Sequence, residues 1–195
     1  MDKAAKRLAV IYVILLSLCA PLMAVHFELF TWFMGVVDMS YWTQTVLWFL
    51  PMLVYGGILV VLGIWNMVKS FQIYKRQDML GCINGMLIHK YGLVIFFCVN
   101  FIVLFLVYFM LTFGLVMGTR GLALLIAPVW LPFVLIMIGW SIVMSWLAIL
   151  PGSIYSIQVI RGSVRTGKIS GGAAVLHGIL QFLFLADVLD AMYLA

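Results

Sequence analysis

Long apolar runs separated by short basic clusters most restrict what this chain can fold into. Leu8–Val25 is one such run, and Tyr91–Met117 is another, broken only by Asn100. Each is long enough for a helix that crosses the hydrocarbon core of a bilayer. The chain is 67% hydrophobic and 9% charged, whereas a soluble domain carries about 25% charged residues. The sequence therefore predicts an all-α polytopic membrane protein, with residues 1–195 forming a single transmembrane domain.

The stretch 70–96 occurs twice in the chain. Placed on residues 156–182 without a gap, it repeats the following residues: Ser70, Gln72, Gly81, Ile83, Gly85, Gly92 and Phe96. Apolar composition alone would not place a serine, a glutamine and three glycines in register. We therefore predict an internal repeat formed by residues 45–117 and residues 131–195.

Each copy of the repeat predicts a helical hairpin. Gly81 offers a left-handed stop for a helix, and Asn84 in the first copy and Ser170 in the second are good N-caps three residues later. We expect the turns at residues 81–84 and 167–170 to be equivalent. Together with a first helix at Leu8–Val25, this gives five transmembrane helices: helix 1, then two parallel-repeat hairpins formed by helices 2 and 3 and by helices 4 and 5.

Basic residues at the hairpin tips predict the orientation. They are Lys75, Arg76, Arg161, Arg165 and Lys168. The positive-inside rule places these tips in the cytoplasm together with the N-terminus of a multi-pass protein of the cell (plasma) membrane. The C-terminus, at the end of a fifth helix over residues 170–195, is then expected outside. Residues 26–44 contain acidic and aromatic side chains but no Lys or Arg, which predicts an outer interfacial segment.

This location explains the net charge of +5 without a nucleic-acid partner. The expected partner is the lipid bilayer, whose anionic headgroups attract each nearby Lys or Arg by about 1 kcal/mol. His89, beside Lys90, is expected to contact headgroups. A docking surface for a cytoplasmic protein is the alternative role of the tips. Other membrane subunits or a homo-oligomer are further candidate partners.

Two carboxylates on the last apolar helix predict a functional site. In the repeat, Asp187 corresponds to Phe101, which lies about 15 Å of helical rise beyond Tyr91 at the inner interface. An intramembrane carboxylate costs about 2.5–3.5 kcal/mol and usually serves a function. We predict a proton or cation site formed by Asp187, Asp190 and Asn100, with polar support from three further residues. These are His177, Gln181 and Ser141.

The depth of this site has an alternative. If the last helix lies two turns farther outward, Asp187 and Asp190 are interfacial residues near the C-terminus, and Arg120 can pair with either of them. The sequence leaves both alternatives open.

No catalytic or metal-binding motif accompanies the carboxylates. The chain has no Walker loop, GxSxG, HExxH or CxxC, so we predict no cofactor, no metal and no enzymatic activity. The leading hypothesis is a membrane transport or transport-accessory protein. The alternative is a non-enzymatic assembly, regulatory or immunity-type subunit that packs on partner proteins, and a membrane enzyme comes third.

Overall fold

The computed structural model describes residues 3–125 and 127–194. Over these residues the chain forms, in order, α1 (Lys3–Val36), α2 (Tyr41–Lys75), α3 (Met79–Gly118), the short 3-10 helix η1 (Leu122–Leu124), α4 (Ala127–Arg165), α5 (Gly171–Leu180) and α6 (Phe184–Leu194). The four long helices α1 to α4 contain apolar segments long enough to cross a membrane. The all-α prediction is confirmed.

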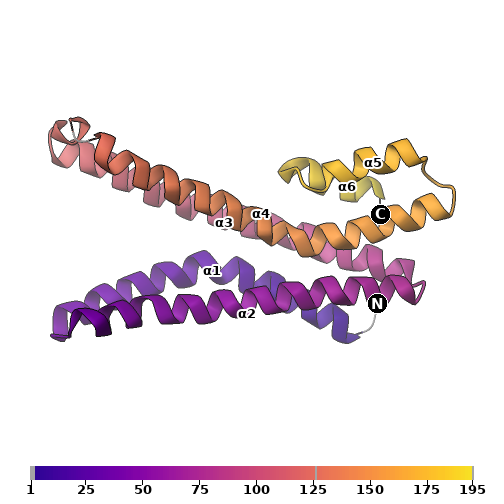
Figure 1. Cartoon of the computed structure of the whole chain (residues 1–195), viewed down its shortest axis with the longest axis horizontal. Helices are drawn as coiled ribbons and strands as arrows, with labels where there is room; N and C mark the ends of the chain where they lie inside the picture. Colours follow the sequence, from indigo (N-terminus) through magenta and orange to yellow (C-terminus); the bar gives the residue numbers. More distant parts are fainter. Residues whose placement is uncertain (1–2, 126, 195) are drawn as a thin grey trace.

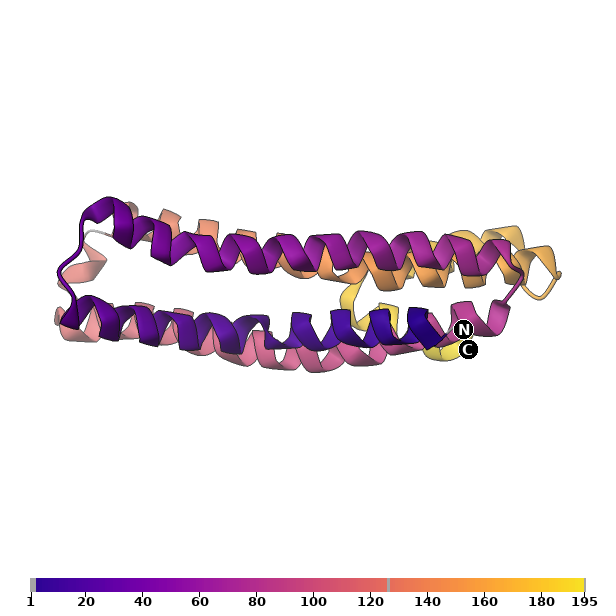
Figure 2. The ribbon, with the colours of Figure 1, turned by 90° about the horizontal axis from the view of Figure 1, so that it is seen from below.

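The long helices form two antiparallel hairpins, α1 with α2 and α3 with α4 (Figure 1). Because α1 packs on α3, α3 on α4, α4 on α2 and α2 on α1, the four helices form a closed ring. Figure 2 shows α1 and α3 in one layer and α2 and α4 in the other. One end of the bundle contains the α2–α3 turn and the last residues of α4, and we call it the basic end. The opposite end contains residues 37–40 and η1, and we call it the far end. The two hairpins diverge toward the far end (Figure 1).

Buried side chains concentrate in the half of the bundle near the basic end. One apolar cluster there contains Ala5, Ile73, Cys82, Met86, Tyr155, Val159 and Ala191. A second contains Tyr12, Val13, Leu16, Leu93, Phe96 and Ala148. Toward the far end, large apolar side chains face outward, including Phe101, Phe105, Phe109 and Phe113 along α3. The tightly packed part of the molecule is therefore the part that also carries the basic tips.

The turn between α2 and α3 differs from the predicted one. The N-cap of α3 is Asp78, whose side chain accepts a hydrogen bond from the Gly81 N–H, and residues 81–84 lie inside the helix. The chain reverses at Gln77, which has a φ of 61°. In the second half, Gly167 has a φ of 70° and Ser170 caps α5 as expected. The prediction of a turn at residues 81–84 is therefore wrong, and the two turns are not equivalent.

The last segment is a short hairpin and not one continuous helix. Asp190 accepts a hydrogen bond from Gln181 and lies 2.5 Å from His177, although 13 residues separate His177 from Asp190. In a continuous helix that separation would be about 20 Å. The α5 and α6 helices, of 10 and 11 residues, are each about 15 Å long and too short to cross the hydrocarbon core. The expected fifth crossing helix over residues 170–195 is therefore wrong.

The end of α6 lies at the basic end, beside the start of α1. Ala191 belongs to the same buried cluster as Ala5, and Leu194 packs against that cluster. Figures 1 and 2 show the start of α1 and the end of α6 on this side of the molecule. The start of α1 and the end of α6 therefore lie at the same end of the bundle, and the predicted placement of the termini on opposite sides of a membrane stays a prediction. The predicted interfacial segment, residues 26–44, is not a separate element, because α1 continues to Val36 and α2 begins at Tyr41.

Candidate functional site

The break between α5 and α6 is supported by side chains from α4. The end of a helix leaves backbone carbonyl groups without partners inside the helix. Ser153 Oγ donates a hydrogen bond of 2.8 Å to the carbonyl of Gln181, and Trp146 Nε1 donates one of 3.3 Å to the carbonyl of Phe182. The chain can therefore turn here without leaving these two carbonyls unpaired.

Asp190 on α6 is held by two side chains of α5. Its Oδ1 lies 2.5 Å from Nδ1 of His177, and its Oδ2 accepts a hydrogen bond from the amide of Gln181. Asp190 is only 6% exposed. A buried carboxylate is costly unless it is hydrogen bonded or paired, and here both of its oxygens have partners.

The network continues to α3 through α4. Lys90 Nζ donates a hydrogen bond of 3.4 Å to Ser153 Oγ, and Ser153 in turn bonds to the carbonyl of Gln181. Lys90 is 1% exposed. We call Lys90, Ser153, His177, Gln181 and Asp190 the Asp190 cluster. It brings a cationic, an anionic and an imidazole side chain from four helices into one buried region.

The predicted site residues divide into two groups. Asp190, His177 and Gln181 come together as described. Asn100 lies ten residues beyond Lys90 on α3, and Ser141 lies twelve residues before Ser153 on α4, so each is about 15 Å or more of helical rise from the cluster. Asp187 lies in α6, but its side chain is outside the part of the chain that the structure describes. The network therefore differs in membership from the predicted site of Asp187, Asp190 and Asn100.

His89 and Lys90 do not contact headgroups, because both are fully buried. The burial of Lys90 could have been predicted from its position inside the apolar α3, because a lysine is rarely buried there unless it is paired. Ser153 gave no signal of its own, because an isolated serine is common in apolar helices.

The predicted basic tips lie on the surface at the basic end. Their exposed residues are Lys75, Arg76, Arg161, Arg165 and Lys168. Arg165 donates a hydrogen bond of 3.4 Å to Gln77, and the guanidinium of Arg161 lies 5.7 Å from the ring centre of Tyr74. These contacts join the α2–α3 turn to the end of α4.

The Asp190 cluster can accept and pass a proton, because a carboxylate and an imidazole share a direct hydrogen bond. It is not arranged as a Ser-His-Asp triad, since Ser153 donates to a backbone carbonyl and not to the imidazole of His177. Among the described residues, no group of three or more His, Cys, Asp or Glu side chains could hold a metal ion.

The fold and this cluster define a class of helical protein. Its members have four long apolar helices compatible with a membrane and a short helical hairpin that carries polar side chains on its inner side. The chain belongs to the family of unknown function DUF6652, whose family model matches residues 3–195. No curated protein and no solved structure matches the chain.

Proposed function

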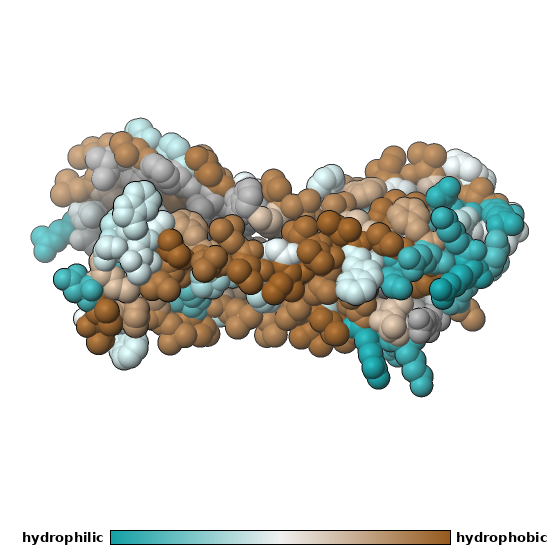
Figure 3. Space-filling view, turned by 60° about the horizontal axis from the view of Figure 1, so that its bottom comes forward, coloured by the Kyte–Doolittle hydropathy of each residue, from teal (hydrophilic) through white to brown (hydrophobic). Residues whose placement is uncertain are grey.

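We propose that this is a multi-pass integral membrane protein whose basic end lies in the cytoplasm. Apolar side chains cover the middle of the molecule, and hydrophilic side chains gather at the basic end (Figure 3). This distribution matches an apolar band in contact with lipid and a positively charged cytoplasmic surface. Residues 3–125 and 127–194 contain four long apolar helices, which favours four crossings with the start of α1 and the end of α6 in the cytoplasm.

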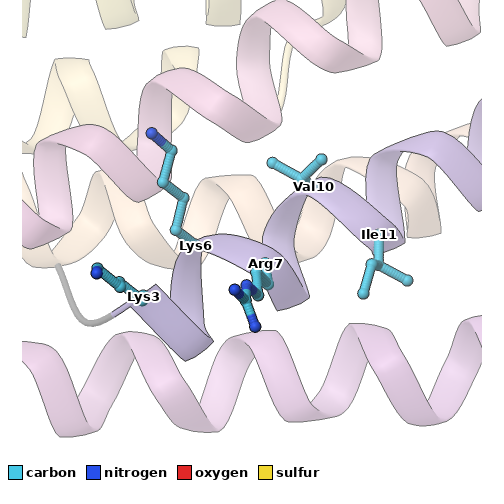
Figure 4. A pocket seen from close by; sticks show the side chains of 5 residues that line it. All are labelled: Lys3, Lys6, Arg7, Val10 and Ile11. Carbon is cyan, nitrogen blue, oxygen red and sulfur yellow. The ribbon is translucent and has the colours of Figure 1, made fainter.

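The start of α1 suits an anionic lipid surface. Lys3, Lys6 and Arg7 line a shallow depression together with Val10 and Ile11 (Figure 4). Basic side chains directly beside exposed apolar ones allow contact with headgroup phosphates and acyl chains at the same time. This favours anionic lipids as the partner of the basic end.

The Asp190 cluster then lies near the cytoplasmic boundary of the membrane. A Cβ added to Gly63 of α2 would lie 3.6 Å from Cγ of Pro151 of α4. Because both helices run toward the basic end, Ser153 lies at about the level of Trp65. Trp65 is 53% exposed, and exposed tryptophan favours the headgroup layer. This depth agrees with neither sequence-based alternative, because those placed the carboxylates near the bilayer centre or farther outward, whereas here the cluster is buried in protein close to the cytoplasmic interface.

The α5–α6 hairpin suits the same layer. Its outward side is apolar and includes exposed Val175, Leu176, Ile179, Leu189 and Met192. Its inward side carries His177, Gln181 and Asp190. A hairpin with an apolar outer side and a polar inner side can lie in the cytoplasmic leaflet, provided that its broken backbone is satisfied by protein groups.

The function that this geometry supports best is proton-linked transport, or an accessory role in it, with the Asp190 cluster as the proton-binding site. The observation that carries the proposal is the buried carboxylate of Asp190 hydrogen bonded to His177. Histidine exchanges protons in the physiological pH range, and ionisable groups buried in membrane proteins commonly serve proton transfer.

The test is proton flux into liposomes that contain the purified protein and an internal pH-sensitive dye. Asp190→Asn keeps the size of the side chain but replaces the carboxylate by an amide that cannot carry a proton across, so we expect flux to fall to that of empty liposomes. Asp38→Asn is the matched control, because Asp38 is an exposed carboxylate at the far end; its flux should equal that of the unmodified protein.

Equal flux from the unmodified protein and from Asp190→Asn, with both folded, would contradict proton transfer through the cluster. If Asp190→Asn instead weakened a complex with another membrane protein and left flux unchanged, the assembly-subunit alternative would replace the transport proposal.

A further inference from the structure

Unpaired polar atoms are buried along the contact between α2 and α4. Asn66 and Ser70 on α2 and Tyr155 and Gln158 on α4 are each 0% exposed. Among the described protein atoms, no hydrogen-bond partner is found for Asn66 Oδ1, Ser70 Oγ, the Tyr155 hydroxyl or either polar atom of the Gln158 amide. A buried polar group left unpaired destabilises the folded state, so a set of five such atoms in one region requires a physical explanation.

The contact between Gly63 and Pro151 shows how these residues align. A Cβ on Gly63 would lie 3.6 Å from Cγ of Pro151, and both helices run from the far end to the basic end. Ser70 and Gln158 each lie about two turns beyond this contact, on the same helix faces as Gly63 and Pro151. Ser70 and Gln158 therefore face one another, although no hydrogen bond joins them directly.

Three further side chains extend this polar region. Asn66 and Tyr155 each lie about one turn closer to the far end. The ring of His89 stacks on Tyr155 with the ring centres 5.2 Å apart; its Nδ1 pairs with the Gly85 carbonyl, while its Nε2 has no described partner. We call Asn66, Ser70, His89, Tyr155 and Gln158 the α2–α4 seam.

The seam is distinct from the Asp190 cluster. Ser153 and Gln158 are five residues apart on α4, so they point in directions about 140° apart around the helix. Ser153 faces α5, whereas Gln158 faces α2.

The hydrogen-bonding groups of the seam indicate which kind of ligand it can bind. Its side chains offer amide and hydroxyl donors as well as amide and hydroxyl acceptors, and they include no carboxylate or thiol that would favour a metal ion. A ligand that both donates and accepts and makes about three hydrogen bonds in a confined space is water. We infer that the α2–α4 seam binds ordered water that bridges Ser70 Oγ and the Gln158 amide. Water in the seam does not require the transport activity proposed above.

The direct test is an experimental structure of the full chain in a lipid nanodisc at a resolution that shows bound water. We expect water within hydrogen-bonding distance of both Ser70 Oγ and the Gln158 amide. A direct Ser70–Gln158 hydrogen bond, or a seam without water, would overturn the inference.

A second test uses thermal unfolding of Ser70→Ala, Gln158→Met and the double variant. If water bridges the two side chains, each single change removes the bridge and lowers the unfolding temperature by several degrees, at about 2–4 °C per kcal/mol for a chain of this size. The double change then lowers it by less than the sum, because the bridge is lost only once.

If the atoms of Gln158 are simply unpaired, Gln158→Met raises the unfolding temperature, and the inference fails. The matched control is Leu16→Ala, in the second apolar cluster, which contains no residue of the seam; its effect should add to that of Ser70→Ala.

Discussion

At the scale of single residues, glycines on α3 decide how closely its neighbours approach. A Cβ on Gly92 would overlap the side chain of Val13 on α1, and one on Gly85 would overlap the ring of Tyr155 on α4. These positions bring α1, α3 and α4 together in the half of the bundle that contains the Asp190 cluster. The positions of Lys90 and His89, between the two glycines, therefore depend on this close packing.

Gly92→Ala should destabilise the bundle. Overpacking costs about 1–3 kcal/mol, which exceeds the helix-propensity gain of about 1 kcal/mol for Gly to Ala. Adding Val13→Ala should recover part of the loss, because it removes the overlapping methyl groups. Gly56→Ala is the control: no atom lies within 4 Å of its added Cβ, so stability should stay equal or rise slightly. Thermal unfolding in detergent measures all three, and a Gly92→Ala protein as stable as Gly56→Ala would refute the packing argument.

The site was predictable from the sequence only in part. Asp190, His177 and Gln181 stood out because polar groups in apolar helices are costly. Their assembly could not be read from the chain, since a continuous helix would place His177 and Asp190 far apart. Ser153 was missed because its role depends on a carbonyl that becomes free only when α5 ends at Gln181.

At the scale of elements, the long helices follow from local sequence but their ends depend on distant contacts. The apolar runs Leu8–Val25 and Tyr91–Met117 lie within α1 and α3, but α1 continues well beyond its run, to Val36. In the α2–α3 connection, Asp78 and Asn84 are both suitable N-caps, and local sequence does not choose between them. Gln77, a residue without the freedom of glycine, takes the left-handed conformation and accepts a hydrogen bond from Arg165 of α4. The α5–α6 turn likewise contains no Gly or Pro, and side chains of α4 support it.

The cap of α3 gives a pH-dependent prediction. Hydrogen bonding from the Gly81 N–H lowers the pKa of Asp78 in the folded protein. A carboxylate with a lowered folded pKa adds stability above its unfolded pKa of about 3.9, and that stability is lost as pH falls through the folded pKa.

Asp78→Ala should therefore cost about 1 kcal/mol at neutral pH, and its difference from the unmodified protein should shrink below about pH 4. Asp78→Asn, which caps without titrating, should stay close to the unmodified protein at neutral pH. Denaturant unfolding at several pH values measures this, and a difference for Asp78→Ala that grows on acidification would contradict the assigned cap.

At the scale of the whole molecule, packing and charge are both asymmetric along the bundle. The basic end contains the buried clusters, the Asp190 cluster, the start of α1 and the end of α6, whereas the hairpins diverge toward the far end and expose many large apolar side chains there. The sequence repeat is not matched by equivalent helices. In the first copy α3 is continuous over 40 residues, whereas in the second copy the chain after α4 divides into α5 and α6. The duplication of residues 45–117 and 131–195 remains a prediction at the level of sequence.

The arrangement of the two ends gives a final prediction about orientation in the membrane. Tyr193 on α6 is 75% exposed and lies at the basic end, and Asp38 is exposed at the far end. In a background with Cys19, Cys82 and Cys98 replaced by alanine, Tyr193→Cys and Asp38→Cys each provide one thiol for a membrane-impermeant reagent. With the basic end in the cytoplasm, the reagent added to intact cells should label Asp38→Cys alone, and Tyr193→Cys should react only after the membrane is opened.

Arg165→Cys should behave like Tyr193→Cys, because both positions lie at the basic end. Labelling of Tyr193→Cys from outside, with Arg165→Cys protected, would restore a fifth crossing and contradict the hairpin of α5 and α6.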